Sequence, residues 1–214
     1  MTRTATLLLF LAAFSAQAQE YHLPFNGRWF VMQGGDTPNV NQHMSVRAQW
    51  FGLDFAKVGG ASQRELTRTA SPSRAEDFYS WGEPVLAPAD GDVAAVIDAL
   101  PDNPLGVKDT RHPAGNHVVI TVAPARFLIL AHFQRGTISV KAGQRVKRGQ
   151  VLGKCGNSGN SDFPHVHMHV QDTAELNAGN GQNATFADIS VELTGTLFEN
   201  VTWPLIRGLF VANH

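Results

Sequence analysis

The chain has 214 residues, of which 43% are hydrophobic, and its 17 Lys and Arg against 18 Asp and Glu give a formal net charge of −1. Because there is no basic excess, neither nucleic acid nor an anionic membrane surface is an expected partner. The single cysteine, Cys155, excludes an intramolecular disulfide framework. We expect Cys155 to be a small buried side chain, with ligation of zinc by its thiolate as the alternative.

The first residues have the pattern of a secretory signal peptide. Arg3 supplies positive charge, residues 6–14 form an apolar run, and Ala16-Gln17-Ala18 is a small-residue cleavage site. The apolar run is shorter than the roughly 20 residues that a helix needs to span a bilayer. We therefore expect residues 1–18 to be removed, leaving a soluble periplasmic or extracellular protein without stable membrane insertion. An uncleaved N-terminal anchor is the alternative.

Short β-branched and apolar runs between turn residues predict a mainly β chain. The expected strands are residues 28–33, 50–56, 84–87, 92–98, 117–122, 127–132, 137–140, 151–153 and 165–171. Residues 61–80 and 173–183 are expected to be surface loops, and apolar alternation in residues 184–214 predicts further strands in the same sheet. Many short strands at close spacing favour an antiparallel sheet or a flattened barrel within one domain.

Three histidines, His165, His167 and His169, occupy every second position of the strand expected at residues 165–171. Alternate residues of a strand share a face, so the three imidazoles should project from one side of the sheet. Imidazole is a common metal ligand and a general base near neutral pH, so the row suggests a metal centre with a catalytic partner. A histidine-rich strand edge without a role is the alternative.

Further metal ligands must come from other strands, because same-side neighbours in the row lie about 7 Å apart at their Cα atoms. Upstream, the chain offers His43 and Asp54. Alternating apolar residues from Phe51 to Phe55 place Asp54 on the opposite face, beside small residues that leave room for its carboxylate. His132 ends a strongly apolar strand. In isolation His43 would be read as an ordinary loop histidine and His132 as a satisfied, partly buried one, and a turn-end or surface aspartate is the alternative for Asp54.

Four motifs, in the same order, resemble those of the M23 family of zinc metallopeptidases, the lysostaphin and LytM type. The motifs run from Trp81 to Val93 (WGEPVLAPADGDV), from Phe127 to His132 (FLILAH), from Val140 to Gly153 (VKAGQRVKRGQVLG) and from Gly156 to His167 (GNSGNSDFPHVH). The resemblance implies a LytM-like domain of antiparallel sheets, of the duplicated hybrid motif type. It also implies a secreted zinc metalloendopeptidase that hydrolyses peptide bonds in peptidoglycan stem peptides or cross-bridges.

Carried over position by position, the resemblance implies one zinc ion held by His43, Asp54 and His167, with catalytic roles for His132 and His165. It also divides the chain after the signal peptide into an N-terminal segment with the upstream zinc ligands (19–80), the peptidase core (81–172) and a C-terminal loop with added strands (173–214). In the mechanism that it implies, zinc activates water, one catalytic histidine accepts a proton and the other stabilises the oxyanion, and the two roles are interchangeable.

The chain departs from the family pattern at two positions. The family has a histidine four residues before the aspartate, where this chain has Trp50, so the expected ligand moves to His43; His22 is the other histidine before Asp54. His169 stands where many members have glutamate, and we expect it to orient His167 or to be an incidental strand residue. Loops at residues 34–48, 102–116 and 172–183 are expected to wall a groove for an extended peptide.

Two rival functions remain at this level. The first is a catalytically inactive M23-like module that binds peptidoglycan or activates another hydrolase, and the altered spacing of His43 is its main support. The second is a lipoyl or biotinyl carrier or a sugar-phosphotransferase domain, suggested by the valine and glycine pattern at residues 84–93 and 140–153. Carriers need a lysine motif at a hairpin tip, which the chain lacks, and the signal peptide argues against cytoplasmic phosphotransfer.

Overall fold

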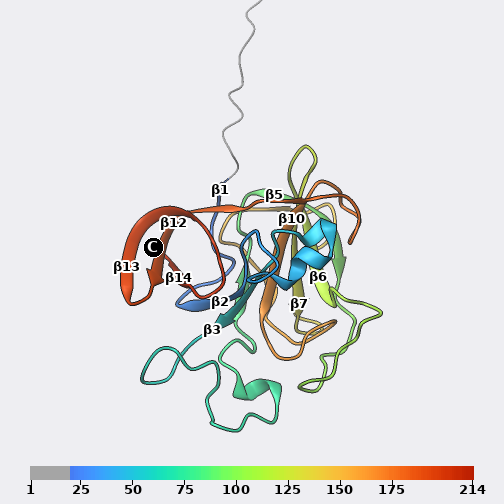
Figure 1. The fold of residues 1–214 in the computed structure, drawn as a ribbon. Helices are drawn as coiled ribbons and strands as arrows, with labels where there is room; N and C mark the ends of the chain where they lie inside the picture. The colour runs from blue at the N-terminus through green and yellow to red at the C-terminus, as the bar shows by residue number, and fades with distance from the viewer. Residues whose placement is uncertain (1–19) are drawn as a thin grey trace, which may run out of the picture.

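A computed structural model describes residues 20–214, which form a mainly β domain (Figure 1). The expected signal peptide, residues 1–18, lies outside the described residues. The strands are β1 (Glu20–Tyr21), β2 (Trp29–Gln33), β3 (Leu53–Lys57), β4 (Pro84–Leu86), β5 (Gly91–Ile97), β6 (Asn116–Ala123), β7 (Arg126–Phe133), β8 (Arg145–Val146), β9 (Val151–Lys154), β10 (Val166–Gln171), β11 (Gly181–Gln182), β12 (Thr185–Leu193), β13 (Thr196–Pro204) and β14 (Phe210–Asn213). The 3-10 helices are η1 (Gln42–Ser45), η2 (Arg47–Gln49) and η3 (Ala75–Asp77).

Most strands belong to one sheet with the order β1-β12-β14-β2-β3-β10-β7-β6-β5-β8, from which β11 and β13 branch. Neighbours pair antiparallel except β1 and β12, which are parallel. A small second sheet consists of β4 and β9. Because the order does not return to its start, the sheet is open. Of the two expected architectures, the antiparallel sheet is the one observed.

The buried core combines aromatic side chains of the N-terminal strands with aliphatic side chains of the central ones. The rings of Phe25 and Trp29 stack with their centres 4.3 Å apart, and Phe55 meets Phe25 edge-on at 5.0 Å. Leu128 and Leu130 of β7 and Met168 of β10 are fully buried in the same cluster. Alternate residues of β10 therefore face this core, which leaves its histidines on the other face.

The structure confirms the strands expected in the C-terminal tail, and it differs from the expected strands at two other segments. Strands β12, β13 and β14 join the main sheet, as the alternation in residues 184–214 predicts. The strand expected at residues 137–140 is wrong: the Asp98 carboxylate accepts hydrogen bonds from the backbone N–H groups of Gly136 and Ile138, which bends the chain into a turn. The strand expected at residues 50–56 begins only at Leu53, because the residues before it complete a turn after η2.

The polar excursion at residues 61–80, which hangs below the sheet in Figure 1, is tied back to the C-terminal strands. Glu192 on β12 accepts a hydrogen bond from Arg28 at 2.6 Å and a second from Arg64 in the excursion. Both guanidinium groups also lie over the ring of Phe210, at 4.5 and 4.6 Å from its centre. Within residues 20–214, none of the helices has the length and hydrophobicity to span a bilayer.

Candidate metal and catalytic site

The site is centred on β10, and the register of this strand with its neighbours β3 and β7 determines which side chains meet there. His167 pairs with Asp54 on β3 and with Ala131 on β7, and His132 follows at the end of β7. Residues directly opposite each other in antiparallel strands point to the same face. The register therefore brings the His167 ring to the Asp54 carboxylate, with 2.9 Å between Nδ1 and Oδ1. Both side chains are buried, at 4% and 2% exposure.

His43 reaches the same carboxylate from the loop between β2 and β3. Asn41, a buried residue, accepts a hydrogen bond from the backbone N–H of His43 at the start of η1. Its side-chain amide donates to the carbonyl oxygens of Gly35 and Trp50, which holds the two ends of the loop together. The imidazole is thereby placed with Nε2 2.9 Å from Oδ2 of Asp54.

Gly52 explains how the His43 ring can lie so close to the start of β3. A Cβ atom at this position would be 2.9 Å from Cγ of His43 and 3.1 Å from the carbonyl oxygen of Gln49. Both distances are shorter than ordinary contacts, and one of the two neighbours is backbone. The small residue beside Asp54 therefore makes room for the imidazole ring, rather than for the carboxylate alone as the sequence suggests.

Three side chains have the donor set and the spacing of a metal site. The ligand atoms of His43, Asp54 and His167 all lie within 4.8 Å of one another. Although Nε2 of His43 is near the Asp54 carboxylate, the geometry is not that of a hydrogen bond, and this buried nitrogen has no hydrogen-bond partner among the described residues. A buried polar atom without a hydrogen-bond partner is costly, and a bound cation would give this nitrogen a partner. Two imidazoles and a carboxylate are a donor set that suits zinc.

A hydrogen-bonded chain along β10 determines which nitrogen of His167 faces this cluster. The side-chain amide of Gln171 donates to the carbonyl oxygens of Thr173 and Glu175, at 2.8 and 2.7 Å, so its own oxygen faces His169. His169 must then donate through Nε2, and in its neutral form it can only accept through Nδ1. Nε2 of His167 lies 2.8 Å from that Nδ1 and has to be the donor.

As a result, Nδ1 of His167 presents a lone pair to the cluster. That lone pair faces Oδ1 of Asp54, and two acceptors at 2.9 Å repel unless a cation, either a proton or a metal ion, stands between them. Burial supports the neutral form of His169 on which this assignment depends, because desolvation and then the neighbouring His167 hold the pKa of His169 well below its usual range. The residues present therefore fit a metal ion.

His132 and His165 lie beside the metal cluster. Their ring centres are 4.7 Å apart, and the His132 ring is 5.9 Å from that of His167. In each of the two histidines Nδ1 faces a backbone carbonyl, Ser158 for His132 at 2.8 Å and Phe163 for His165 at 2.9 Å. Since a carbonyl only accepts, Nδ1 carries the proton, and Nε2 is the free base of the neutral ring.

The backbone of His132 adopts φ +66°, the left-handed region that residues other than glycine and asparagine seldom use. Main-chain hydrogen bonds hold it there: its N–H donates to Ala114 and its carbonyl accepts from Gly156. Strained backbone of this kind persists where surrounding structure fixes it, and it is concentrated at functional sites.

Burial and the Asp54 carboxylate shift the pKa values of His132 and His165 in opposite net directions. Burial, together with the neighbouring His165 and His167, holds the pKa of His132 well below its usual range. Burial also disfavours the charged form of His165, but Asp54, 3.5 Å from its Nε2, together with the Phe163 carbonyl and Asp162, outweighs burial and raises the pKa of His165. The pKa of Asp54 lies well below its usual range, since the surrounding histidines outweigh its burial. A metal ion on Asp54 would weaken the attraction felt by His165.

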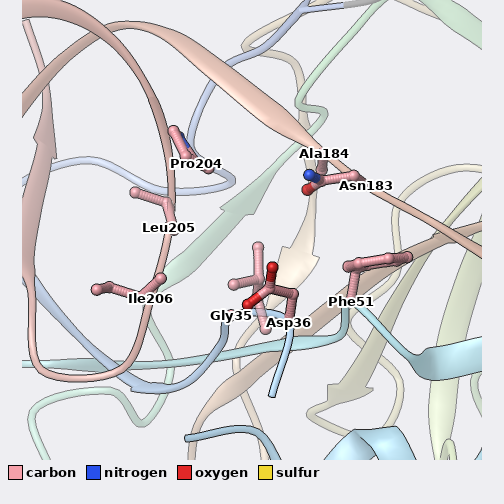
Figure 2. Close-up of a pocket in the computed structure, with 9 residues that line it drawn as sticks. Gly35, Asp36, Phe51, Asn183, Ala184, Pro204, Leu205 and Ile206 are labelled. Carbon is pink, nitrogen blue, oxygen red and sulfur yellow. The ribbon is translucent and has the colours of Figure 1, made fainter.

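The cluster lies in a groove with a volume of about 870 Å³. The three loops expected to wall a groove all contribute, through residues such as Val46, Lys108 and Asn177. Two contributors come from unexpected places, Leu66 from the polar excursion and Arg207 from the turn between β13 and β14. A second pocket of about 200 Å³ shares none of these residues (Figure 2), and Asp36 is the ionisable side chain among those that line it.

The structure brings together all five side chains that the sequence nominates, His43, Asp54, His132, His165 and His167. Cys155 is buried in the hydrophobic core and is not one of the clustered ligand residues, as expected of a small core side chain. His22 contacts Arg148 and Asp188 instead, so His43 is the upstream histidine at the site. Asn41 and Gln171 are supporting residues that no sequence motif singles out, although Gln171 continues the alternation of the histidine row.

Side chains with the donor set of a metal site, beside two further histidines in an open groove, are typical of metal-dependent hydrolases. Residues 73–183 match the model of peptidase family M23. This chain therefore belongs to family M23. The match includes His132, His165 and His167 but neither His43 nor Asp54, which come from the chain before it.

Relatives with similar sequences include two bacterial proteins. The chain is 35% identical over 151 residues to the peptidoglycan DD-endopeptidase ShyA of Vibrio cholerae, covering 70% of this chain and 31% of the relative. It is 33% identical over 156 residues to an uncharacterized metalloprotease of Haemophilus influenzae, covering 70% and 29%. The chain thus spans about three tenths of the length of these relatives. Among solved structures, it is similar to the catalytic domain of a mutant of the prophage-encoded M23 protein EnpA from Enterococcus faecalis, with 23% identity, a TM-score of 0.46, and coverage of 76% of this chain and 93% of that one.

Proposed function

We propose that the protein is a secreted zinc metalloendopeptidase that hydrolyses peptide bonds in peptidoglycan stem peptides or cross-bridges. The observation that carries the proposal is the convergence of His43, Asp54 and His167 on one small volume that calls for a cation. Membership of family M23 and the similarity to a peptidoglycan DD-endopeptidase support the same reaction and substrate. A periplasmic or extracellular location follows from that substrate and from the signal-peptide pattern of residues 1–18.

We assign His43 Nε2, the Asp54 carboxylate and His167 Nδ1 as the ligands of one zinc ion. When bound, zinc supplies a Lewis acid that polarises the scissile carbonyl and lowers the pKa of water. The protein contributes a fixed tautomer at His167, through His169 and Gln171, and a fixed position for His43, through Asn41. These supporting contacts orient the ligands before metal binds.

His132 and His165 are the proton carriers in this proposal. Each has Nδ1 tied to a backbone carbonyl, which orients the ring and leaves Nε2 to accept a proton from the attacking water. Once protonated, the same Nε2–H can donate to the oxyanion of the tetrahedral intermediate and pass a proton to the leaving amine. Because both rings have Nδ1 on a backbone carbonyl, the two roles are interchangeable with respect to this contact, although His165 differs in having Asp54 near its Nε2.

A combined binding and digestion experiment tests the function. The purified chain should bind one equivalent of zinc and release soluble peptide fragments from peptidoglycan sacculi, detected by chromatography and mass spectrometry. Chelation, and the substitutions H132A and H165A, should abolish release. H117A is the matched control, because His117 is a buried histidine that binds Gly115 and does not line the groove.

Failure to bind zinc would contradict the metal assignment. Binding of zinc and of sacculi without release of fragments would instead identify the protein as an inactive binding module.

A further inference from the structure

Arg207 places a positive charge in the wall of the catalytic groove. It belongs to the turn between β13 and β14, beyond the residues that match the family model. Its side chain is exposed, and its guanidinium group has neither an ion pair nor a side-chain hydrogen bond anywhere in residues 20–214. The other cation of the wall differs, because Lys108 pairs with Asp162 at 2.8 Å.

Hydrogen bonds hold the backbone around Arg207 to the sheet, so the Cα atom from which its side chain extends has a fixed position. The N–H groups of Arg207 and Gly208 donate to Gly34 and Val31, and the N–H of Val31 donates back to Leu209. Leu205 and Leu209, on either side, are buried at 4% and 1% exposure. Figure 2 shows the residues immediately before Arg207, from Pro204 to Ile206, along the wall of the second pocket.

The charges of the groove leave Arg207 without a counter-ion in the protein. The Asp54 carboxylate is buried and already surrounded by three histidines, and Asp162 is taken by Lys108. A guanidinium group presents a planar fork of donors that matches a carboxylate. Of the lysine and arginine side chains among the described lining residues, Arg207 is the one without an ion pair, so it is available to bind a ligand with a free carboxylate.

We propose that Arg207 binds a free carboxylate of the peptide substrate and so makes the protein selective for anionic peptides. This inference rests on the proposed peptidase function, because it concerns the substrate of the same groove. A stem peptide has two sources of such a group, the carboxylate at the end of the chain and the carboxylates of its side chains. The chemistry that Arg207 recognises is common to both.

The test compares three forms of one synthetic cross-linked pair of stem peptides. In the first all carboxylates are free, in the second the terminal carboxylate is an amide, and in the third the side-chain carboxylates are amides. The wild-type protein should cleave one of the amidated forms with kcat/KM lower by about 5- to 10-fold, chiefly through a higher KM. The form that loses activity identifies the source of the carboxylate.

Two substitutions make the comparison specific to this residue. R207A should lose the discrimination between free and amidated peptides, and R207K should retain part of it, because lysine keeps the charge but not the fork. R135A is the matched control: Arg135 is also exposed and without a side-chain partner in the described chain, but it does not line the groove. Thermal unfolding of R207A should match the wild type, since its backbone contacts remain.

The outcomes separate this inference from the proposed function. If the wild-type protein cleaves all three peptides and R207A changes none of the rates, Arg207 is an ordinary solvated side chain and the inference is overturned. If the zinc-loaded wild-type protein cleaves none of them and releases nothing from sacculi, it is the peptidase function that fails. Equal losses in R207A and R135A would indicate a general charge effect and would also overturn the inference.

Discussion

Removing the His169 side chain should weaken zinc binding, although His169 is not one of the assigned ligands. In H169A, Nε2–H of the buried His167 loses the acceptor that lies 2.8 Å away. An unsatisfied buried donor costs about 1 to 3 kcal/mol. Loss of a partner that orients a metal-bound histidine lowers metal affinity by about 10- to 100-fold, which is the same range in free energy. We therefore expect the Kd for zinc to rise by about 10- to 100-fold.

Competition for zinc against a chromophoric chelator measures this change directly, without an activity assay. H117A is again the control, since it removes a buried imidazole elsewhere in the sheet and should leave the Kd for zinc unchanged. H169E should recover part of the affinity, because a carboxylate can accept the same hydrogen bond. Q171L should act in the same direction as H169A with a smaller effect, and the double variant should lose less than the sum, because both residues belong to one hydrogen-bonded chain. A Kd within twofold of the wild type in H169A would refute the reasoning.

Three further predictions follow from the supporting structure. G52A should raise the Kd for zinc, because its Cβ would displace the His43 ring. G149A, at a turn where a Cβ meets nothing, should leave the Kd unchanged. Equal affinities for zinc in G52A and the wild type would contradict this account of the packing. H132G should be more stable than H132A by about 1 kcal/mol in denaturant unfolding, because glycine relieves the left-handed backbone and both variants lack the imidazole; equal midpoints would show that the strain is absent. E192Q should lose about 1 kcal/mol of stability at neutral pH. The hydrogen bond from Arg28 is the first cause that lowers the pKa of Glu192. The stability that the Glu192 carboxylate contributes is therefore complete above the ordinary pKa of glutamate and is lost as the pH falls through the lowered pKa. A stability difference between E192Q and the wild type that persists in acid would argue against the ion pairs.

The parts of the site that are local in sequence could be predicted from it. Alternation over residues 165–171 places His165, His167 and His169 on one face, and the structure confirms that their rings gather there, with His165 directly before β10. The apolar run before His132 likewise marks a buried strand. The two-residue period alone would place His132 on the core face with Leu128 and Leu130, and the left-handed backbone at His132, beside a break in the β6–β7 register, brings its ring to the site instead.

The parts that depend on long-range packing could not be predicted. Whether His43 can replace the histidine missing at Trp50 depends on hydrogen bonds of Asn41 that cross the loop, and no local pattern reveals them. Arg207 enters the groove because the tail folds back against β2, a contact between residues more than 170 positions apart. The prediction of a strand at residues 137–140 fails for a similar reason, since the carboxylate of Asp98, which follows the distant strand β5, accepts hydrogen bonds from the backbone there.

The chain of hydrogen bonds that begins at His167 ends chiefly on main-chain carbonyl oxygens, those of Thr173 and Glu175, with one longer hydrogen bond to the Thr173 hydroxyl. Every residue type has a carbonyl, so a loop side chain that takes no part in these hydrogen bonds, such as Leu176, can be exchanged while the path of the loop is kept. The same loop supplies Leu176 and Asn177 to the groove wall. Substrate preference can therefore drift during evolution, or be redesigned, by changing loop side chains while the metal ligand stays oriented. An insertion, or a proline that alters the path of the loop, would affect both at once.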